Sequence, residues 1–288
     1  MIIHGWKYYN HAAIPTCEPH EMPNLEPIKD GSIWKMDGKP LLARWTEEYD
    51  CGYETSWWYC VLDKPFDIAK LKANRRYKIK KGNRLFEVRE IEPLDYAEDL
   101  LRVQKAAFSA YPRKYRPRVN EDEFNKYLVY YSQDIRQGGS IFYGAFYNET
   151  NELCGYHIVT IGRGYKECNV LKTNPEFEKY QINAALVYKW VMDSEDLLKS
   201  GGYIADGTRT INHETAFQDY LEYYFGFRKA YCKLWIKYRP LMHKIVALLY
   251  PLRKIIVKMD AVGFIHQINA VLMMEEYARL CNSGGEEC

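Results

Sequence analysis

The order of strand and helix patterns between residues 84 and 239 is the strongest constraint on what this chain can fold into. Residues 84–91 alternate in polarity with period two, which predicts a strand. Helical spacing follows over residues 94–108 and 121–136, and the rest predicts a hairpin, a strand, a helix, a strand, a helix and a last strand. This order predicts an α/β (α+β) fold with a mixed, mostly antiparallel sheet flanked by helices.

The segments outside that region have a different character. Residues 1–62 are aromatic and rich in turns, and Asp37-Gly38 between apolar runs at 33–36 and 41–45 predicts a hairpin. Residues 241–281 have helical spacing. We therefore predict a β-rich N-terminal extension that ends in a basic segment, a central domain and a C-terminal helical appendage, at residues 1–82, 83–240 and 241–288.

Composition excludes several classes of protein. Hydrophobic residues make up 47 % of the 288 and charged residues 27 %, so the chain is not disordered. Lys plus Arg is 40 and Asp plus Glu is 38, a net charge of +2, which argues against a dedicated nucleic-acid binder. Tyrosine is unusually frequent, with 26 residues.

Targeting and metal signals are missing from the sequence pattern. The first residues lack the basic and apolar stretches of a signal peptide, and no window is apolar enough for a membrane span. The eight cysteines form no CxxC pair, which disfavours a zinc ribbon. We expect a cytoplasmic protein with reduced thiols and no metal.

The element order over residues 84–239 resembles the GNAT acyltransferase fold, in which an aromatic helix runs into Gly-Phe before the last strand, as at Phe225-Gly226-Phe227. Two motifs resemble the FemAB-like (peptidoglycan-bridge) subgroup more closely. The basic stretch at 74–81 is similar to its RR-x-I-x-K pattern, and Asp206-Gly207 followed by Phe-Gly is similar to its D-x-G … FG pattern.

The resemblance implies transfer of an acyl or aminoacyl group to an amine by direct attack, without a covalent enzyme intermediate. The donor would be acyl-CoA or aminoacyl-tRNA, and the acceptor a small molecule or a cell-envelope precursor. One departure supports an alternative, a catalytically silent GNAT-fold scaffold or binding protein. Residues 177–185 contain no glycine, although CoA-binding members carry a glycine-rich loop there for close approach to the pyrophosphate.

Four residues are candidates for acid–base catalysis. Asp206 follows a short strand at an edge where sites collect in α/β folds, and a carboxylate there can deprotonate an amine; alternatively it shapes the turn before Gly207. His213 at the start of a predicted helix is a second candidate base, or a solvent-facing residue. Tyr223 and Tyr224 can protonate a leaving group, or simply pack.

Binding residues follow from the resemblance and from charge. The resemblance assigns the donor to the backbone of the fourth core strand and to the following helix start, at Val170, Leu171, Lys172, Tyr180, Gln181, Ile182, Asn183 and Ala184. Eight of the fifteen residues at 70–84 are basic, and that run suits a phosphate group, including that of a tRNA acceptor end, or is a solvated helix face. Substrate contacts are expected at Arg75, Arg76, Lys80, Lys81, Arg113, Arg116 and His157.

Residues 241–258 are apolar and basic at once. They include Lys244, Arg253, Lys254 and Lys258, with Pro251 between two helical stretches. Such a segment can lie on an anionic membrane surface, or it can pack on its own domain or on a partner subunit. The sequence leaves both interpretations open.

Overall fold

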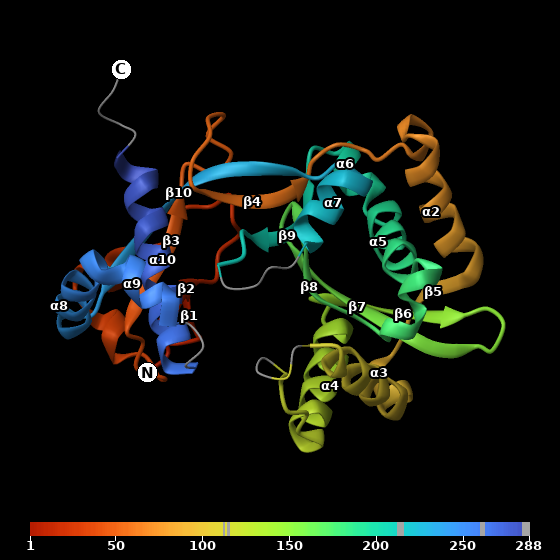
Figure 1. Ribbon diagram of the computed structural model, residues 1–288, viewed down its shortest axis with the longest axis horizontal. Coiled ribbons are helices and arrows are strands. Elements are labelled where there is room, and N and C mark those ends of the chain that lie inside the picture. Colours follow the sequence, from red (N-terminus) through yellow and green to blue (C-terminus); the bar gives the residue numbers. More distant parts are fainter. Residues whose placement is uncertain (112, 114–115, 212–215, 260–262, 284–288) are drawn as a thin grey trace. The chain divides into compact units, whose positions relative to one another are not determined.

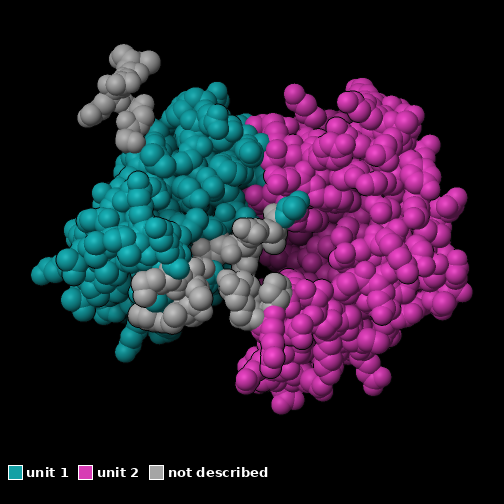
Figure 2. Space-filling model, viewed as in Figure 1, with its two compact units in different colours: residues 1–60, 208–216, 229–288 teal, residues 61–207, 217–228 magenta. Residues whose placement is uncertain are grey.

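The computed structural model describes residues 1–111, 113, 116–211, 216–259 and 263–283. The chain forms two compact units, which Figure 2 shows in different colours. Unit 1 comprises residues 1–60, 208–216 and 229–288, and unit 2 comprises residues 61–207 and 217–228. The boundaries of these units differ from the predicted boundaries at residues 82 and 240. The predicted division into three domains remains a prediction.

Unit 2 contains a five-stranded sheet in the order β9-β8-β7-β6-β5 (Figure 1). All its neighbours are antiparallel except β8 and β9, which are parallel. The strands are β5 Phe86–Glu90, β6 Ser140–Tyr147, β7 Glu152–Gly162, β8 Tyr165–Thr173 and β9 Tyr203–Thr208. The α-helices are α2 Ala73–Leu85, α3 Ala97–Ser109, α4 Glu121–Arg136, α5 Ile182–Met192, α6 Glu195–Lys199 and α7 Phe217–Phe225.

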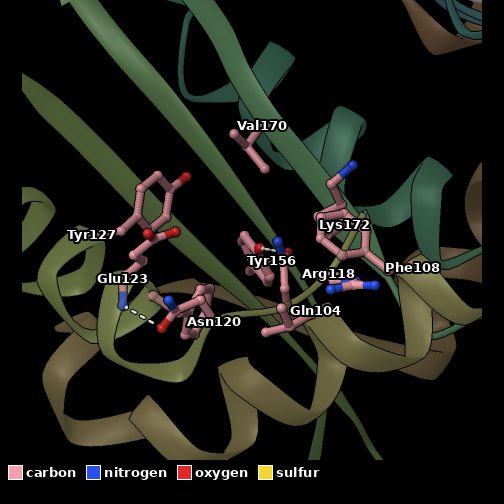
Figure 3. Close-up of a pocket in the computed structure, with 11 residues that line it drawn as sticks. Gln104, Phe108, Arg118, Asn120, Glu123, Tyr127, Tyr156, Val170 and Lys172 are labelled. Atoms are coloured by element: carbon pink, nitrogen blue, oxygen red, sulfur yellow. Dashed lines mark hydrogen bonds between the residues drawn. The ribbon is translucent and has the colours of Figure 1, made fainter. Parts of the chain in front are cut away.

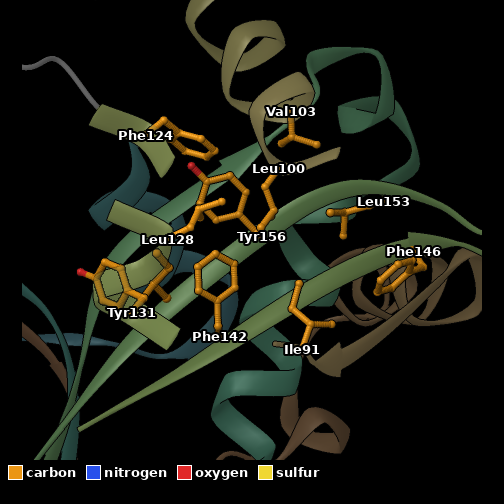
Figure 4. Close-up of a cluster of buried hydrophobic side chains, with 11 residues drawn as sticks. Ile91, Leu100, Val103, Phe124, Leu128, Tyr131, Phe142, Phe146, Leu153 and Tyr156 are labelled. Atoms are coloured by element: carbon orange, nitrogen blue, oxygen red, sulfur yellow. The ribbon is translucent and has the colours of Figure 1, made fainter. Parts of the chain in front are cut away.

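Helices cover both faces of this sheet. Helices α3 and α4 pack on one face, where Leu100, Leu128 and Phe142 belong to a buried cluster with Tyr156 and Ile158 of β7 (Figure 4). Helix α5 contacts the sheet through β5, β6 and β7. Because side chains alternate along a strand, His157 lies on the face opposite its two neighbours, against Trp190 of α5 with ring centroids 5.0 Å apart.

Unit 1 has strands in the order β1-β2-β3-β10-β4, and only β2 and β3 among the pairs with a defined register are parallel. The strands are β1 Trp6–Tyr9, β2 Ala12–Pro15, β3 Leu42–Glu47, β10 Arg228–Tyr238 and β4 Trp57–Leu62, the last of which continues into unit 2. The α-helices are α1 Glu26–Lys29, α8 Pro240–Leu249, α9 Arg253–Ile256 and α10 Gly263–Ser283. Within the described ranges, no helix combines the length and the apolar character needed to cross a bilayer.

The predicted mixed, mostly antiparallel sheet flanked by helices is confirmed. The hairpin predicted at 33–45 is wrong in its first arm, because residues Ser32–Lys35 form a 3-10 helix after Gly31 at φ +75°. That turn buries Ile33 completely in a cluster with Trp6 and Ala13, which a half-exposed strand would not do.

Helix α2 contacts α5 through Gly82, where the two backbones approach closely. A Cβ at residue 82 would lie 2.5 Å from the carbonyl oxygen of Gln181 and 3.2 Å from the nitrogen of Ala185, and neither atom can move as a side chain can. Gly82→Ala is therefore expected to lower the free energy of unfolding by about 1–3 kcal/mol, measured by urea titration. Lys80→Ala on the exposed face of the same helix is the control and should change it by less than about 0.5 kcal/mol.

Candidate active site

The parallel strands β8 and β9 pair over only three positions before they part. Tyr165 to Glu167 lie opposite Tyr203 to Ala205, yet β8 continues to Thr173. The first residues beyond the last pair are Cys168 on β8 and Asp206 on β9. We call this opening, with β8 residues 168–173 on one side and Asp206 on the other, the split.

A bulge in β8 lies directly at the split. Ile158 pairs with Val170 while Val159 pairs with Cys168, so Asn169 is the extra residue. Its amide donates to the hydroxyl oxygens of Thr160 at 2.5 Å and Tyr131 at 3.3 Å. The side chain of Asn169 is thereby fixed on the α4 side of the sheet, and the backbone of the following residues turns relative to β7.

Asp206 is a half-buried carboxylate with an unusual pKa. Burial raises the pKa of Asp206 to about 6. The hydrogen bonds that Cys168 and Gln218 of α7 donate to the carboxylate lower the pKa, but by less than burial raises it. At pH 7 the group is therefore mostly ionised, yet it holds a proton far better than an ordinary aspartate does. A carboxyl group poised in this way suits general-base catalysis near neutral pH.

A pocket of about 360 Å³ lies against the second half of β8, between the sheet and helices α3 and α4 (Figure 3). Val170 and Lys172 of the split line it, so the pocket adjoins the split on the α3–α4 side. Its other walls come from α3, α4, β7 and the residues before α4: Gln104, Phe108, Arg118, Val119, Asn120, Glu123, Phe124, Tyr127 and Tyr156.

The pocket combines aromatic walls with both signs of charge. The Tyr156 hydroxyl donates to Oε1 of Gln104, and burial raises the pKa of Tyr127 and of Tyr156 above the usual range, so both stay neutral. The Lys172 ammonium donates to the Tyr111 hydroxyl at 2.9 Å and keeps further donors for a ligand. With Arg118 and Glu123, the pocket offers two cations and one carboxylate.

The residues predicted to bind the donor lie on the second half of β8 and at the start of α5. Val170 and Lys172 face the pocket, and Leu171, opposite His157, faces the α5 side. The side chains of Ile182 and Ala184 are buried, and Asn183 accepts a hydrogen bond from Thr173 at 3.1 Å. Gln181 has φ +70° and makes no side-chain cap, while Tyr180 stacks on Tyr147. The first turn of α5 therefore leaves its backbone N–H groups without a side-chain cap.

The basic run at 70–84 forms α2, and several of its cations already bind protein groups. Arg75 donates to the Tyr223 carbonyl oxygen at 2.7 Å and covers its ring at 3.7 Å. Arg76 donates to the Ala69 carbonyl at 3.2 Å. Lys81 donates to the Lys179 carbonyl at 3.0 Å, and Lys80 is exposed. Of the predicted phosphate contacts on this helix, Lys80 is therefore the most accessible.

The two candidate tyrosines face α2. The hydroxyl of Tyr224 accepts from Lys78 at 2.9 Å, and Tyr223 is 51 % exposed beneath Arg75. Because Lys78 donates to the Tyr224 oxygen, the Tyr224 hydroxyl keeps its own proton to donate elsewhere.

Four further predicted residues have different outcomes. His157 does not line the pocket, because its side chain is fully buried on the α5 face and burial lowers its pKa to about 3. Arg116 is fixed on the α3–α4 connection by the Tyr111 carbonyl at 3.3 Å, and Arg113 is exposed. His213 lies outside the described residues. Among the described His, Cys, Asp and Glu side chains, no group of three is placed to share a metal ion.

Several pocket residues escaped the sequence analysis. Arg118 belonged to the basic connection at 113–118 but was not chosen. Glu123 and Tyr127 are four residues apart and so share one face of α4, a spacing that was available as a signal. Gln104 and Tyr156 come from separate elements, and only the tertiary fold joins them.

Comparisons with known proteins give limited information. No family model matches the sequence, and no curated protein matches it. Among solved structures, L-PGS from Bacillus licheniformis is 9 % identical with a TM-score of 0.48, over 85 % of this chain and 83 % of that one. A conserved protein of unknown function from Bacteroides thetaiotaomicron is 13 % identical with a TM-score of 0.49, over 78 % of each chain.

A tandem GNAT protein from the clavulanic acid biosynthesis pathway is 11 % identical with a TM-score of 0.45, over 79 % of this chain and 75 % of that one. With TM-scores of 0.45–0.49 and identities of 9–13 %, these likenesses establish neither the family nor the function of this chain.

Proposed function

We propose that this protein is a GNAT-type N-acyltransferase whose reaction takes place at the split. The observation that carries the proposal is the Asp206 carboxyl, with a pKa near 6, at the point where β8 and β9 part. The pocket adjoins the same opening from the α3–α4 side of the sheet, through Val170 and Lys172. The element order of unit 2 and this parting of two central strands are also what the resemblance to the GNAT fold implies. The chemistry needs a base, a polarised carbonyl and a protonated leaving group.

The proposed reaction is a direct displacement. Asp206 takes a proton from the acceptor amine, and the free nitrogen attacks the carbonyl carbon of the donor. A backbone N–H of residues 170–172 polarises the carbonyl oxygen. The new C–N bond forms as the C–S bond of acyl-CoA, or the C–O bond of aminoacyl-tRNA, breaks. Tyr224 is the proposed acid for the leaving group, because its hydroxyl oxygen accepts from Lys78 and its own proton stays available to be donated. The tyrosine regains a proton from the nitrogen, which loses its second proton as the amide forms.

Charge and pocket shape support a particular kind of acceptor. An amine is attracted by Glu123, and an anionic group on the same molecule by Arg118 and Lys172. The aromatic walls accommodate an apolar portion. We therefore propose an amine that also carries a carboxylate or phosphate, as small amino acids and cell-envelope precursors do.

The donor is acyl-CoA or aminoacyl-tRNA, and the FemAB-like subgroup would favour the second. Lys81, whose ammonium donates to the Lys179 carbonyl oxygen shortly before α5, and the uncapped first turn of α5 are the proposed phosphate contacts. Residues 177–185 have no glycine and α2 packs on the first turn of α5, and both observations favour the alternative of a GNAT-fold binding protein without catalysis.

Calorimetric titration with acetyl-CoA, a long-chain acyl-CoA and an aminoacyl-tRNA separates these possibilities. The proposal expects saturable binding of one donor and release of its carrier when an amine is added. Binding without amine-dependent turnover supports the scaffold. Binding of none of the three contradicts both donor assignments.

Removing one pocket cation tests the acceptor. Arg118→Ala is expected to raise KM for an anionic amine about ten-fold and to leave kcat nearly unchanged, because a charge-assisted hydrogen bond contributes about 1.5–3 kcal/mol. Steady-state kinetics with an amino acid and with its uncharged amide make the comparison. Arg136→Ala, at an exposed arginine in the last turn of α4 that does not line the pocket, is the control. An equal KM effect on both acceptors would contradict the anionic-acceptor assignment.

A further inference from the structure

Residues 240–258 of unit 1 form two apolar faces, and only one of them is buried. The inner face packs with Leu42, Tyr238 and Leu272 in a core cluster; it consists of Met242, Val246, Leu249, Tyr250 and Ile256. In Figure 1 this segment, with α8 and α9, lies together with α10, which it contacts. The unit therefore already has a core on that side, and the second face has no role in it.

The outer face is a row of large exposed side chains, which we call the stripe. Three of them share one side of α8 at i, i+4 and i+7 spacing, and two more follow in the 3-10 turn at 250–252 and on α9. They are Leu241 (70 % exposed), Ile245 (40 %), Leu248 (73 %), Leu252 (47 %) and Ile255 (63 %), with Val257 (48 %) beside them. Single exposed apolar residues are ordinary, but a row of this kind marks a contact surface.

The charged side chains of residues 240–259 themselves are all basic. Lys244, Lys254 and Lys258 are exposed, whereas Arg253 is held by Glu276 at 3.2 Å and by the ring of Tyr250. Residues 240–259 contain no Asp or Glu. A row of aliphatic side chains flanked by lysines is complementary to a surface that is negatively charged outside and apolar inside.

We infer that this stripe, with its three lysines, docks unit 1 on the surface of an anionic lipid bilayer. The helices would lie in the plane of the interface, with the leucines among the upper acyl chains and the lysines at the headgroups. A second copy of the chain is a poorer occupant, because two such faces would bring six lysines together. The inference stands independently of the acyl-transfer proposal.

Vesicle co-sedimentation of the full chain tests this inference. Binding is expected to be at least about ten-fold tighter on phosphatidylcholine vesicles that contain phosphatidylglycerol than on phosphatidylcholine alone, and to fall in high salt. The triple substitution of Lys244, Lys254 and Lys258 by Gln should weaken binding by about a hundred-fold, since each lysine near an anionic surface contributes about five-fold.

The matched pair of apolar variants completes the test. Leu248→Asp with Ile255→Asp should abolish vesicle binding and leave the circular dichroism spectrum unchanged, because both side chains are mostly exposed. Val129→Asp, an exposed apolar residue on α4, should bind as the unsubstituted chain does. The inference would be overturned if phosphatidylglycerol did not change the affinity for vesicles, or if the double variant bound vesicles as tightly as the unsubstituted chain. The stripe would be assigned to self-association instead if the unsubstituted chain bound no vesicles and formed a dimer, and if the double variant Leu248→Asp with Ile255→Asp were monomeric.

Discussion

Replacing Asp206 with asparagine is expected to lower amine acylation by at least about a hundred-fold, because a positioned general base contributes about 10²–10⁴-fold to the rate. Donor affinity should stay unchanged, since asparagine occupies the same volume and still accepts hydrogen bonds from Cys168 and Gln218. For the unsubstituted enzyme, kcat/KM should rise with pH with a midpoint near 6, where the Asp206 carboxyl ionises. That limb should vanish in Asp206→Asn.

The same substitution is expected to stabilise the protein at pH 8. Folding raises the pKa of Asp206 from 3.8 to about 6, so the folded state binds the proton more tightly than the unfolded state does. The stabilisation is therefore complete below pH 3.8 and lost as the pH rises through 6, a difference of about 2–3 kcal/mol. Asparagine has no charge to bury, and the urea midpoint at pH 8 should rise.

Asp219→Asn is the matched control, because Asp219 is an exposed aspartate in the first turn of α7. It should leave both rate and stability almost unchanged. A variant at Asp206 that is less active and also less stable would mark a residue that shapes the turn before Gly207. An unchanged rate would remove Asp206 from the mechanism.

The second large effect concerns acid stability and His157. The ring lies between Tyr143 and Trp190, and neither of its nitrogens has a hydrogen-bond partner among the described groups. Burial lowers its pKa from 6.5 to about 3, so the unfolded state takes up a proton that the folded state refuses. The stabilisation is present above pH 6.5 and is lost as the pH falls toward 3, at a cost of about 4–5 kcal/mol over the whole range.

His157→Phe should remove this loss, because phenylalanine keeps the aromatic packing and does not titrate. We compare the free energy of unfolding of the variant with that of the unsubstituted protein at two pH values. The difference, variant minus unsubstituted, should be about 2–3 kcal/mol larger at pH 4.5 than at pH 8. Comparing the two proteins at each pH cancels the opposite contribution of Asp206. His4→Asn, at an exposed histidine, should show no such gain. Parallel pH profiles for His157→Phe and the unsubstituted protein would show that His157 is not buried neutral.

Elements with strong local signals were predictable from the sequence. Asn120 accepts hydrogen bonds from the N–H groups of Asp122 and Glu123, as an asparagine N-cap does, and α4 has the predicted bounds. The hairpin of β6 and β7 follows α4, as the predicted order of elements has it. These features depend on neighbours within a few residues, so the local sequence is sufficient to predict them.

Long-range contacts decided the features that could not be predicted. Which face of β7 meets α5 depends on packing, so His157 was predicted as a substrate contact although its ring packs against Trp190 of α5. Arg75 binds the carbonyl of Tyr223, 148 positions away, and no charge pattern in the basic run indicates that contact. Among 26 tyrosines, sequence alone did not select Tyr127 and Tyr156, because the pocket exists only where four elements meet.

Transfer from a radiolabelled donor tests the central claim most directly. The unsubstituted protein and Asp206→Asn are each incubated with the donor that binds best by calorimetry, and with a panel of amines with and without an anionic group. The amide product should form with the unsubstituted protein in proportion to carrier released, and at least about a hundred-fold more slowly with the variant at equal donor affinity. Equal rates of product formation by the two proteins would contradict a reaction at the split.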